Sequence, residues 1–488
     1  MPPHSDPNHS RRWLVLAVIA IAQLMVILDA TIVNIALPSA QQDLGFTDDS
    51  RQWIVTAYAL AFGSLLLLGG RIGDLFGRKW TFIGGLLGFS MASAVGGAAG
   101  SFGVLVAARA AQGVFGAILA PSALGLLATT FTDPRERGKA FGIFGSIAGA
   151  GAAIGLLLGG ILTQTLSWRW CLYVNLLFAL PAAVFAFRLI VNQAHPQRPR
   201  IDVPGTLLAT TGLFALVYGF SNSETHSWGH PVTIVMLAAA VVLLGAFVAV
   251  EQRVQHPLLP LRVLADRTRG GAYAAIGLAG IAMFALFLFL TYYLQRTLGF
   301  SPIETGIAFL PMSASIIITA NIVSQRLLAK NGPRPHMVVG MLFGVAAMLY
   351  LTRLDADSSY ALHVLPALIA MGIGMGNIFP PAFQSATYGV ERTDTGVASA
   401  MVNTMQQVGG SIGTALLSSI FASAVTSYAD GRARTPQVLQ AATVHGYTVA
   451  FWVAAGVFAF GALVVGLLVP SLRLAPAHEV TAEPVTAH

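Results

Sequence analysis

Fourteen apolar runs, each about as long as a membrane-spanning helix, follow one another along the chain with only short polar connections between them. A helix needs about 20 apolar residues to cross the hydrocarbon core of a bilayer. Lipid cannot satisfy the backbone groups of any other open structure. We therefore expect an all-α protein that crosses the membrane many times. The expected spans are 13–36, 51–70, 80–99, 103–129, 138–162, 169–191, 202–222, 231–251, 269–296, 303–329, 336–352, 361–389, 395–427 and 446–470.

The composition excludes most other classes of protein. Charged residues make up 10% of the 488 residues and hydrophobic residues 55%, and no long polar block interrupts the apolar runs. The net charge of +7 lies in short loops, where membrane insertion explains it, so no nucleic-acid partner is expected. The sequence has no zinc-type histidine cluster, phosphate-binding glycine loop or nucleophile elbow, so we expect no metal, no cofactor, no ATP-driven pump and no enzyme.

The distribution of Lys and Arg predicts the orientation in the membrane. If the N-terminus is cytoplasmic, the inside loops and tails hold twenty of the 27 cations, the outside loops hold six, and Arg109 lies within a span. Positive charges favour the cytoplasmic side. We therefore expect both termini inside, with cytoplasmic tails at 1–12 and 471–488, in the inner (cytoplasmic) membrane of the cell.

A charged turn recurs in degenerate form. Residues 70–79 link the second and third spans, and residues 325–334 lie 255 positions later between the tenth and eleventh spans. Transporter folds are commonly built from such repeats. The same offset predicts two six-helix bundles, 13–191 and 269–470, separated by a region, 192–268, that holds two extra membrane helices. Ala329 replaces Asp74 in the second copy, so the functional charges are expected in the first half.

Asp29 and Arg109 are the two charged residues expected deep within spans. A charge at the centre of a bilayer is costly unless it is paired or serves a water-filled path. At 1.5 Å per residue, both residues lie at about the same depth from the outer face, so they are expected to meet. Two interpretations are open: a structural ion pair, or a proton switch in which Asp29 binds a proton and Arg109 opposes this. We favour the switch, because a permanent buried pair stabilises a protein weakly.

The turn at 70–79 holds more charge than a connector needs. Cations there follow from the positive-inside rule, but Asp74 does not. We expect Asp74 to accept from the amides at a helix N-terminus or to pair with Arg135 or Arg137, and so to hold a cytoplasmic gate shut. The expected gate residues are Gly70, Arg71, Gly73, Asp74, Gly77, Arg78 and Lys79.

Glycines repeat through the fifth span. Spacings of four allow two membrane helices to approach closely. We expect this glycine face to pack tightly, and to meet the opposite half of the protein, where sliding is needed. The residues concerned are Gly142, Gly151, Gly155, Gly159 and Gly160.

These motifs resemble those of a known family. The turn at 70–79 matches the Gly-x-x-x-Asp-x-x-Gly-Arg-Lys signature of the major facilitator superfamily, and residues 28–38 resemble a motif of its fourteen-span drug:proton antiporters. Residues 109–113, 142–160 and 372–381 are similar to further motifs of that group. One departure is Leu156, where the antiporter motif has proline. The resemblance implies the major facilitator fold, a monomer, and proton-driven export of drugs, antibiotics or related hydrophobic and aromatic molecules by alternating access.

The substrate cavity is expected near the membrane midplane between the halves. Buried amide side chains need a partner or a wet cavity, and aromatic rings line many ligand sites. The candidates are Asn34, Tyr58, Gln112, Phe284, Tyr292, Asn377, Phe383, Gln384, Asn403, Gln406 and Gln407. Two alternatives stay open: a proton-coupled importer of a small metabolite, and a membrane sensor that binds a ligand without transporting it.

Overall fold

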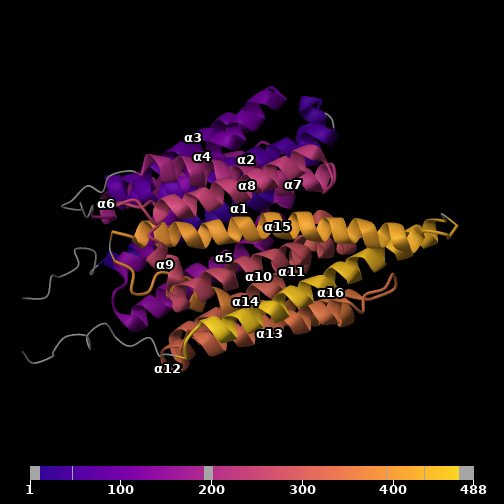
Figure 1. Cartoon of the computed structure of the whole chain (residues 1–488). Coiled ribbons are helices and arrows are strands. Elements are labelled where there is room, and N and C mark those ends of the chain that lie inside the picture. The colour runs from indigo at the N-terminus through magenta and orange to yellow at the C-terminus, as the bar shows by residue number, and fades with distance from the viewer. Residues whose placement is uncertain (1–10, 47, 192–201, 392, 434, 472–488) are drawn as a thin grey trace, which may run out of the picture.

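The computed structural model describes residues 11–46, 48–191, 202–391, 393–433 and 435–471, and in these ranges the regular structure is entirely helical. The helices run side by side along one common direction (Figure 1). Six long helices form the N-terminal half: α1 (Arg12–Leu44), α2 (Asp48–Phe76), α3 (Arg78–Gly97), α4 (Phe102–Thr130), α5 (Pro134–Thr165) and α6 (Trp170–Leu189).

Two further helices follow the N-terminal half. These are α7 (Val203–Thr225) and α8 (Pro231–Glu251), which pack against each other, and α7 also contacts α2 and α15. A short helix, α9 (Leu261–Ala265), then leads into the C-terminal half. We call α7 and α8 the extra pair.

The C-terminal half also contains six long helical segments, three of which include a short π-helical stretch. The elements are α10 (Arg267–Tyr292) with η2 (Tyr293–Thr297), α11 (Pro302–Ile322) with η3 (Val323–Leu327) and α12 (Leu328–Asn331), α13 (Pro333–Leu351), η4 (Tyr360–Val364) with α14 (Leu365–Ala386), α15 (Thr395–Ala429) and α16 (Pro436–Leu468).

Thirteen of the helices in the described ranges are long and apolar enough to cross a bilayer. The remaining expected span falls in α5, which is 32 residues long and whose described part includes the shorter apolar stretch 154–165. Large apolar side chains are also exposed on the outside of the molecule: Leu177 is 66% exposed, and Val241 and Leu467 are each 73% exposed. Such an outer surface suits lipid rather than water.

The connection at 70–79 differs from the expected turn. Helix α2 continues to Phe76 and α3 begins at Arg78, so the connection is reduced to Gly77. Gly77 has a φ of 87° and Gly332, its counterpart in the repeat, has a φ of 76°. Both angles lie in the left-handed region that glycine adopts without strain. Both connections therefore turn at a glycine with a positive φ angle.

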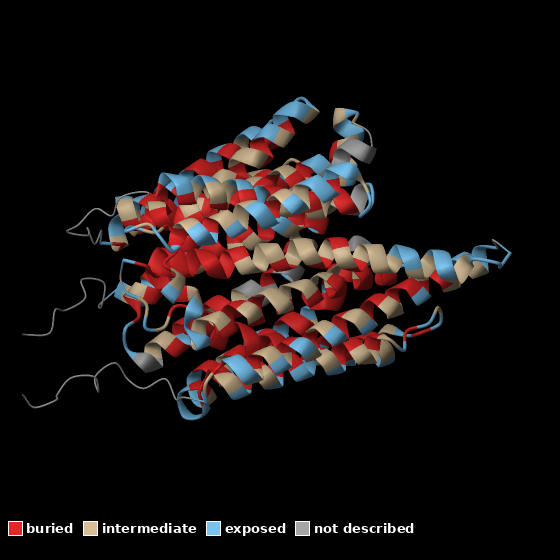
Figure 2. Ribbon diagram, in the orientation of Figure 1, coloured by how far each residue is buried: buried red, intermediate tan, exposed pale blue. Residues whose placement is uncertain are grey.

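The two halves meet along two seams. Helix α5 packs against α11 and α14, and α2 packs against α15. Buried residues follow these contacts through the middle of the molecule (Figure 2). The first seam includes an aromatic contact, with the ring centroids of Phe144 and Phe383 5.9 Å apart.

Candidate functional site

Asp29 and Arg109 form an ion pair inside the N-terminal half. A 2.6 Å contact joins Arg109 Nη1 on α4 to Asp29 Oδ2 on α1, and the side chains are 2% and 0% exposed. The structure therefore brings together the two charges that the sequence placed at similar depth.

Two amides complete the hydrogen bonding of the Asp29 carboxylate. Gln112 Nε2 donates to Oδ1 at 2.9 Å, and Asn175 Nδ2 donates to the same oxygen at 2.7 Å. Ser93 Oγ accepts from both amides, at 2.7 Å from Gln112 and 3.3 Å from Asn175. The Asp29 carboxylate therefore accepts from three side chains on α4 and α6. Loss of its charge would therefore disturb side chains on α1, α3, α4 and α6 together.

Arg109 has further partners on α2 and α4. Its Nη1 donates to Gln112 Oε1 at 2.7 Å, its Nε donates to the Ile54 carbonyl at 3.4 Å, and its guanidinium lies 4.4 Å from the Tyr58 ring centroid. A cation over an aromatic face is attracted by the ring. Arg109 is therefore held by groups on α2 as well as by Asp29 and Gln112.

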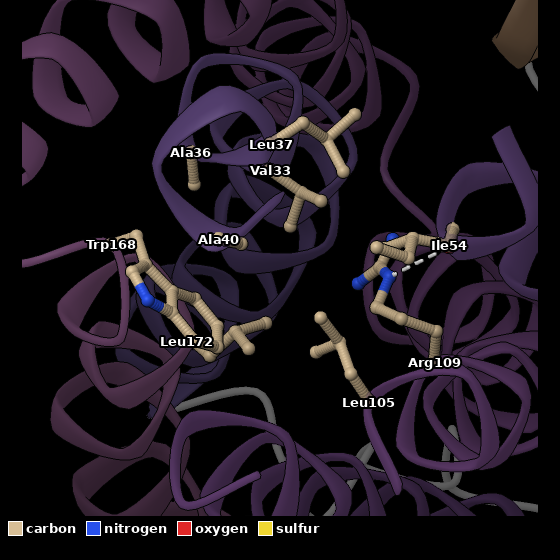
Figure 3. A pocket seen from close by; sticks show the side chains of 9 residues that line it. All are labelled: Val33, Ala36, Leu37, Ala40, Ile54, Leu105, Arg109, Trp168 and Leu172. Atoms are coloured by element: carbon tan, nitrogen blue, oxygen red, sulfur yellow. Dashed lines mark hydrogen bonds between the residues drawn. The ribbon is translucent and has the colours of Figure 1, made fainter. Parts of the chain in front are cut away.

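Arg109 lines a small cavity, and Figure 3 shows the side chains around it. Its other walls are almost wholly apolar and come from α1, α2, α4, α6 and the loop before α6. Trp168 lines the cavity and donates from Nε1 to Asp43 Oδ2 at 3.0 Å. The lining residues are Val33, Ala36, Leu37, Ala40, Ile54, Leu105, Arg109, Trp168 and Leu172.

Asp74 lies buried at the contact between α2 and α15. Arg78 Nη2 donates to Asp74 Oδ1 at 2.9 Å. A Cβ placed on Gly396, in the first turn of α15, would lie 2.5 Å from Asp74 Oδ2, and one on Gly70 would lie 2.6 Å from the Gly396 carbonyl oxygen. The two halves thus touch backbone to backbone beside a buried carboxylate. Such a contact is possible only because both positions lack a side chain.

Arg137 does not pair with Asp74, contrary to one expectation. It donates instead to the Ala128 carbonyl at 3.1 Å and to Thr387 Oγ1 at 2.9 Å, so it links the start of α5 to the end of α14. Burial lowers the pKa of Arg137 to about 10, at which it stays charged at neutral pH. The side chain of Arg135, the other expected partner, lies outside the described residues.

The remaining members of the expected gate surround Asp74. Arg71 is buried beside it, and Gly73 approaches Ser122 of α4. Lys79 points away from the contact between halves, donating to the Phe187 carbonyl of α6 at 2.7 Å.

The glycines of α5 pack against two different parts of the protein. This corrects the expectation that they form a single face on which the halves slide. Gly151, Gly155 and Gly159 approach Ile27, Thr31 and Ile32 of α1, within the same half. Gly142 and Gly160 instead approach Ser324 and Ile303 of the other half. Because residues four apart share one face of a helix, the 151–155–159 series forms a fixed contact between α5 and α1.

The expected substrate residues do not all share one place. Tyr58 and Gln112 belong to the Asp29 cluster described above, and Asn377 faces His336 within the C-terminal half, with 3.4 Å between Oδ1 and Nδ1. Tyr292 is 40% exposed and lies under Arg296 near the expected outer end. A role for these four in a substrate cavity stays a prediction. The side chain of Asn34 lies outside the described residues.

Other expected substrate residues do lie near the contact between halves. Phe383 faces Phe144, and Gln407 lies where α15 meets Gly63 of α2, with its Cγ 2.9 Å from a Cβ placed on that glycine. Gln384 is buried and Gln406 is half-buried. Phe284 is half-buried on α10, and Asn403 is buried on α15, where its Nδ2 donates to the Ser399 carbonyl at 3.0 Å.

Sequence reasoning did not place Ser93 or Asn175 beside Asp29. Ser93 carries no signal in the sequence, because serines are common in membrane helices. The donors to the Asp29 carboxylate come from α4 and α6, and only the packing of these helices shows which amides face it.

The fold consists of two helical halves that share an interface, and one half holds a buried ion pair. This arrangement is typical of secondary transporters built from repeated bundles. The sequence pattern of the Major Facilitator Superfamily matches residues 19–414. The chain belongs to this superfamily.

Several relatives cover nearly the whole chain. The puromycin resistance protein pur8 of Streptomyces alboniger is 50% identical over 94% of this chain and 92% of its own length. The cephamycin export protein CmcT of Amycolatopsis lactamdurans is 37% identical over 81% of this chain and 82% of its own length. The crystal structure of the human organic anion transporter MFSD10 superposes with a TM-score of 0.65 at 15% identity, covering 93% of this chain and 99% of that one, which shows a shared fold.

Proposed function

We propose that this protein exports antibiotic-type small molecules from the cell in exchange for protons. It acts as a monomer in the cytoplasmic membrane, without a cofactor. The observation that carries the proposal is Asp29, a fully buried carboxylate whose pairing with Arg109 depends on its charge. The kinship with proteins named for puromycin resistance and cephamycin export supports the substrate class.

The contacts of Asp29 and Arg109 can couple proton binding to a movement of α2. A proton on Asp29 removes the counter-charge of Arg109, whose guanidinium then depends on Gln112, Ile54 and Tyr58. Two of those three partners lie on α2, and the far end of α2 carries Asp74 against α15. A shift of α2 would therefore reach the gate. In alternating access, such a rigid element opens one side as it closes the other.

The contact between the halves favours aromatic substrates with little positive charge. Phe144, Phe379 and Phe383 form a ring cluster on α5 and α14. Among the described residues from α10 to α16, the buried acidic side chain is Asp394, just before α15. A dication would find no deep counter-charge in that half. Neutral, anionic or singly charged aromatic compounds suit the site better.

We expect expression of this protein in a bacterium lacking its own drug pumps to raise the inhibitory concentration of puromycin several-fold. The physical reason is that export lowers the internal concentration of the drug. A panel of other antibiotics and dyes, with cellular accumulation measured directly, tests how broad the export is.

A protonophore serves as the control, since it should restore accumulation in expressing cells. Higher accumulation on expression would indicate an importer. Binding without any change in accumulation would indicate a sensor, and either result would overturn the proposal.

A further inference from the structure

The segment 252–266 connects the extra pair to the C-terminal half, and we call it the strap. Glu251, the last residue of α8, accepts from two strap amides: Oε1 from Leu258 at 3.2 Å and Oε2 from Leu259 at 3.0 Å. Leu258 and Leu259 are themselves buried. A Cβ on Gly205 of α7 would lie 2.5 Å from Glu251 Oε1. The first half of the strap is thus fixed to Glu251 of α8, which itself packs against α7.

The second half of the strap is fixed to the C-terminal half. Arg262, on α9, donates from Nη2 to Asp394 Oδ2 at 2.6 Å and lies 3.4 Å from Glu391 Oε1. Arg269 of α10 donates to the carbonyls of Val263 and Arg262, each at 3.1 Å. Figure 1 shows α9 beside the end of α15 that begins at Thr395.

Asp394 links the strap to the gate. It directly precedes α15, and Gly396, two residues later, contacts Gly70 and Asp74 of α2. Arg71 of α2 is also close enough to Asp394 to interact with its charge. Opposite charges therefore alternate across the contact, from Arg262 to Asp394 to Arg71.

We propose that Arg262 is a positioning residue of the gate, through which the extra pair holds the start of α15 against α2. The function of the extra pair is then to anchor the strap, which keeps the transporter closed where α15 meets α2. The proposal rests on alternating access, as set out under Proposed function. It requires neither proton coupling nor a particular substrate.

Gate opening is measured by the labelling of one cysteine at the closed contact. The background is Cys171→Ser, which removes the chain's single natural cysteine, and the reporter is Ser399→Cys, a fully buried position one turn beyond Gly396. The full-length protein in lipid nanodiscs is treated with a bulky maleimide. Asp74→Asn, which weakens the gate directly, serves as the positive control.

We expect Arg262→Ala to raise the labelling rate about two- to fivefold, the range for an ion pair in which one partner is exposed. The Arg262 side chain is 60% exposed, so its removal leaves folding intact, whereas Asp394 is 7% exposed. Arg262→Lys keeps the charge and should restore most of the closure. Glu251→Leu, which frees the two strap amides, should also raise the rate with Arg262 in place.

The matched control is Arg267→Ala. Arg267 is the first residue of α10, two residues beyond the end of α9, and its exposed side chain donates to the Leu467 carbonyl instead of to the gate. It should label at the parental rate. The proposal is overturned if Arg262→Ala labels like the parent while Asp74→Asn labels faster, or if Arg267→Ala accelerates labelling as much as Arg262→Ala. Labelling needs no drug and no proton gradient, so a failure of export would not affect this result.

Discussion

Asp29→Asn is expected to abolish proton-driven export while leaving folded protein in the membrane. In the native protein, Arg109 Nη1 lies 2.6 Å from Asp29 Oδ2. Asparagine keeps an oxygen that can accept this hydrogen bond, but its side chain cannot bind and release a proton. Substrate binding should persist, because we propose that it takes place at the contact between the halves and not at Asp29. The measurement is drug uptake into proteoliposomes driven by an imposed pH gradient, together with equilibrium drug binding in detergent.

The matched control is Asp43→Asn, the same substitution on the same helix. Asp43 pairs with Arg169 at 2.9 Å, but its side chain is 48% exposed, so it gains little from the pair and should tolerate the change. Asp29→Glu retains a titratable group and should keep partial activity. Full gradient-driven transport by Asp29→Asn would show that the Asp29–Arg109 pair is structural, the other interpretation open from the sequence.

Gly69→Ala is expected to destabilise the N-terminal half strongly. A Cβ on Gly69 would overlap the carbonyl oxygen of Ala117 on α4 and would lie 2.7 Å from the carbonyl carbon. Backbone atoms cannot rotate aside, so α2 and α4 must separate. Overpacking of this kind costs about 1–3 kcal/mol or more. The measurement is the melting temperature of the purified protein in detergent, followed by its tryptophan fluorescence.

The control for this prediction is Gly84→Ala on α3. No atom lies within 4 Å of a Cβ placed there, and alanine favours a helix over glycine by about 1 kcal/mol. This variant should melt at or slightly above the parental temperature. Equal melting of Gly69→Ala and the parent would mean that α2 and α4 are not in contact as described.

The spans were largely predictable because they depend on local composition. The expected span at 231–251 coincides with α8, and that at 395–427 lies within α15. The ends of helices were less predictable where charged residues continue them. Helix α2 runs on through Arg71 and Asp74 to Phe76, because these two charges are buried among other parts of the protein, with Asp74 paired to Arg78, instead of facing lipid.

The members of the candidate site were predictable one at a time, but their grouping was not. Asp29 and Arg109 stood out because charges are rare within apolar spans. Their common depth followed from the rise of a helix. Asn175 and Ser93 join them through the packing of α3 and α6 on α1 and α4, and the amino-acid types alone do not specify that packing.

The sequence by itself determined that the chain is a helical membrane protein with two related halves, an extra pair of helices and one buried ion pair. Those features follow from the cost of placing polar groups in lipid, which acts on each segment separately. Only the tertiary structure decided that the glycines of α5 serve two neighbours and that Arg262 reaches the gate. Such contacts depend on which faces of distant helices meet, and that is settled by the fit of many side chains at once.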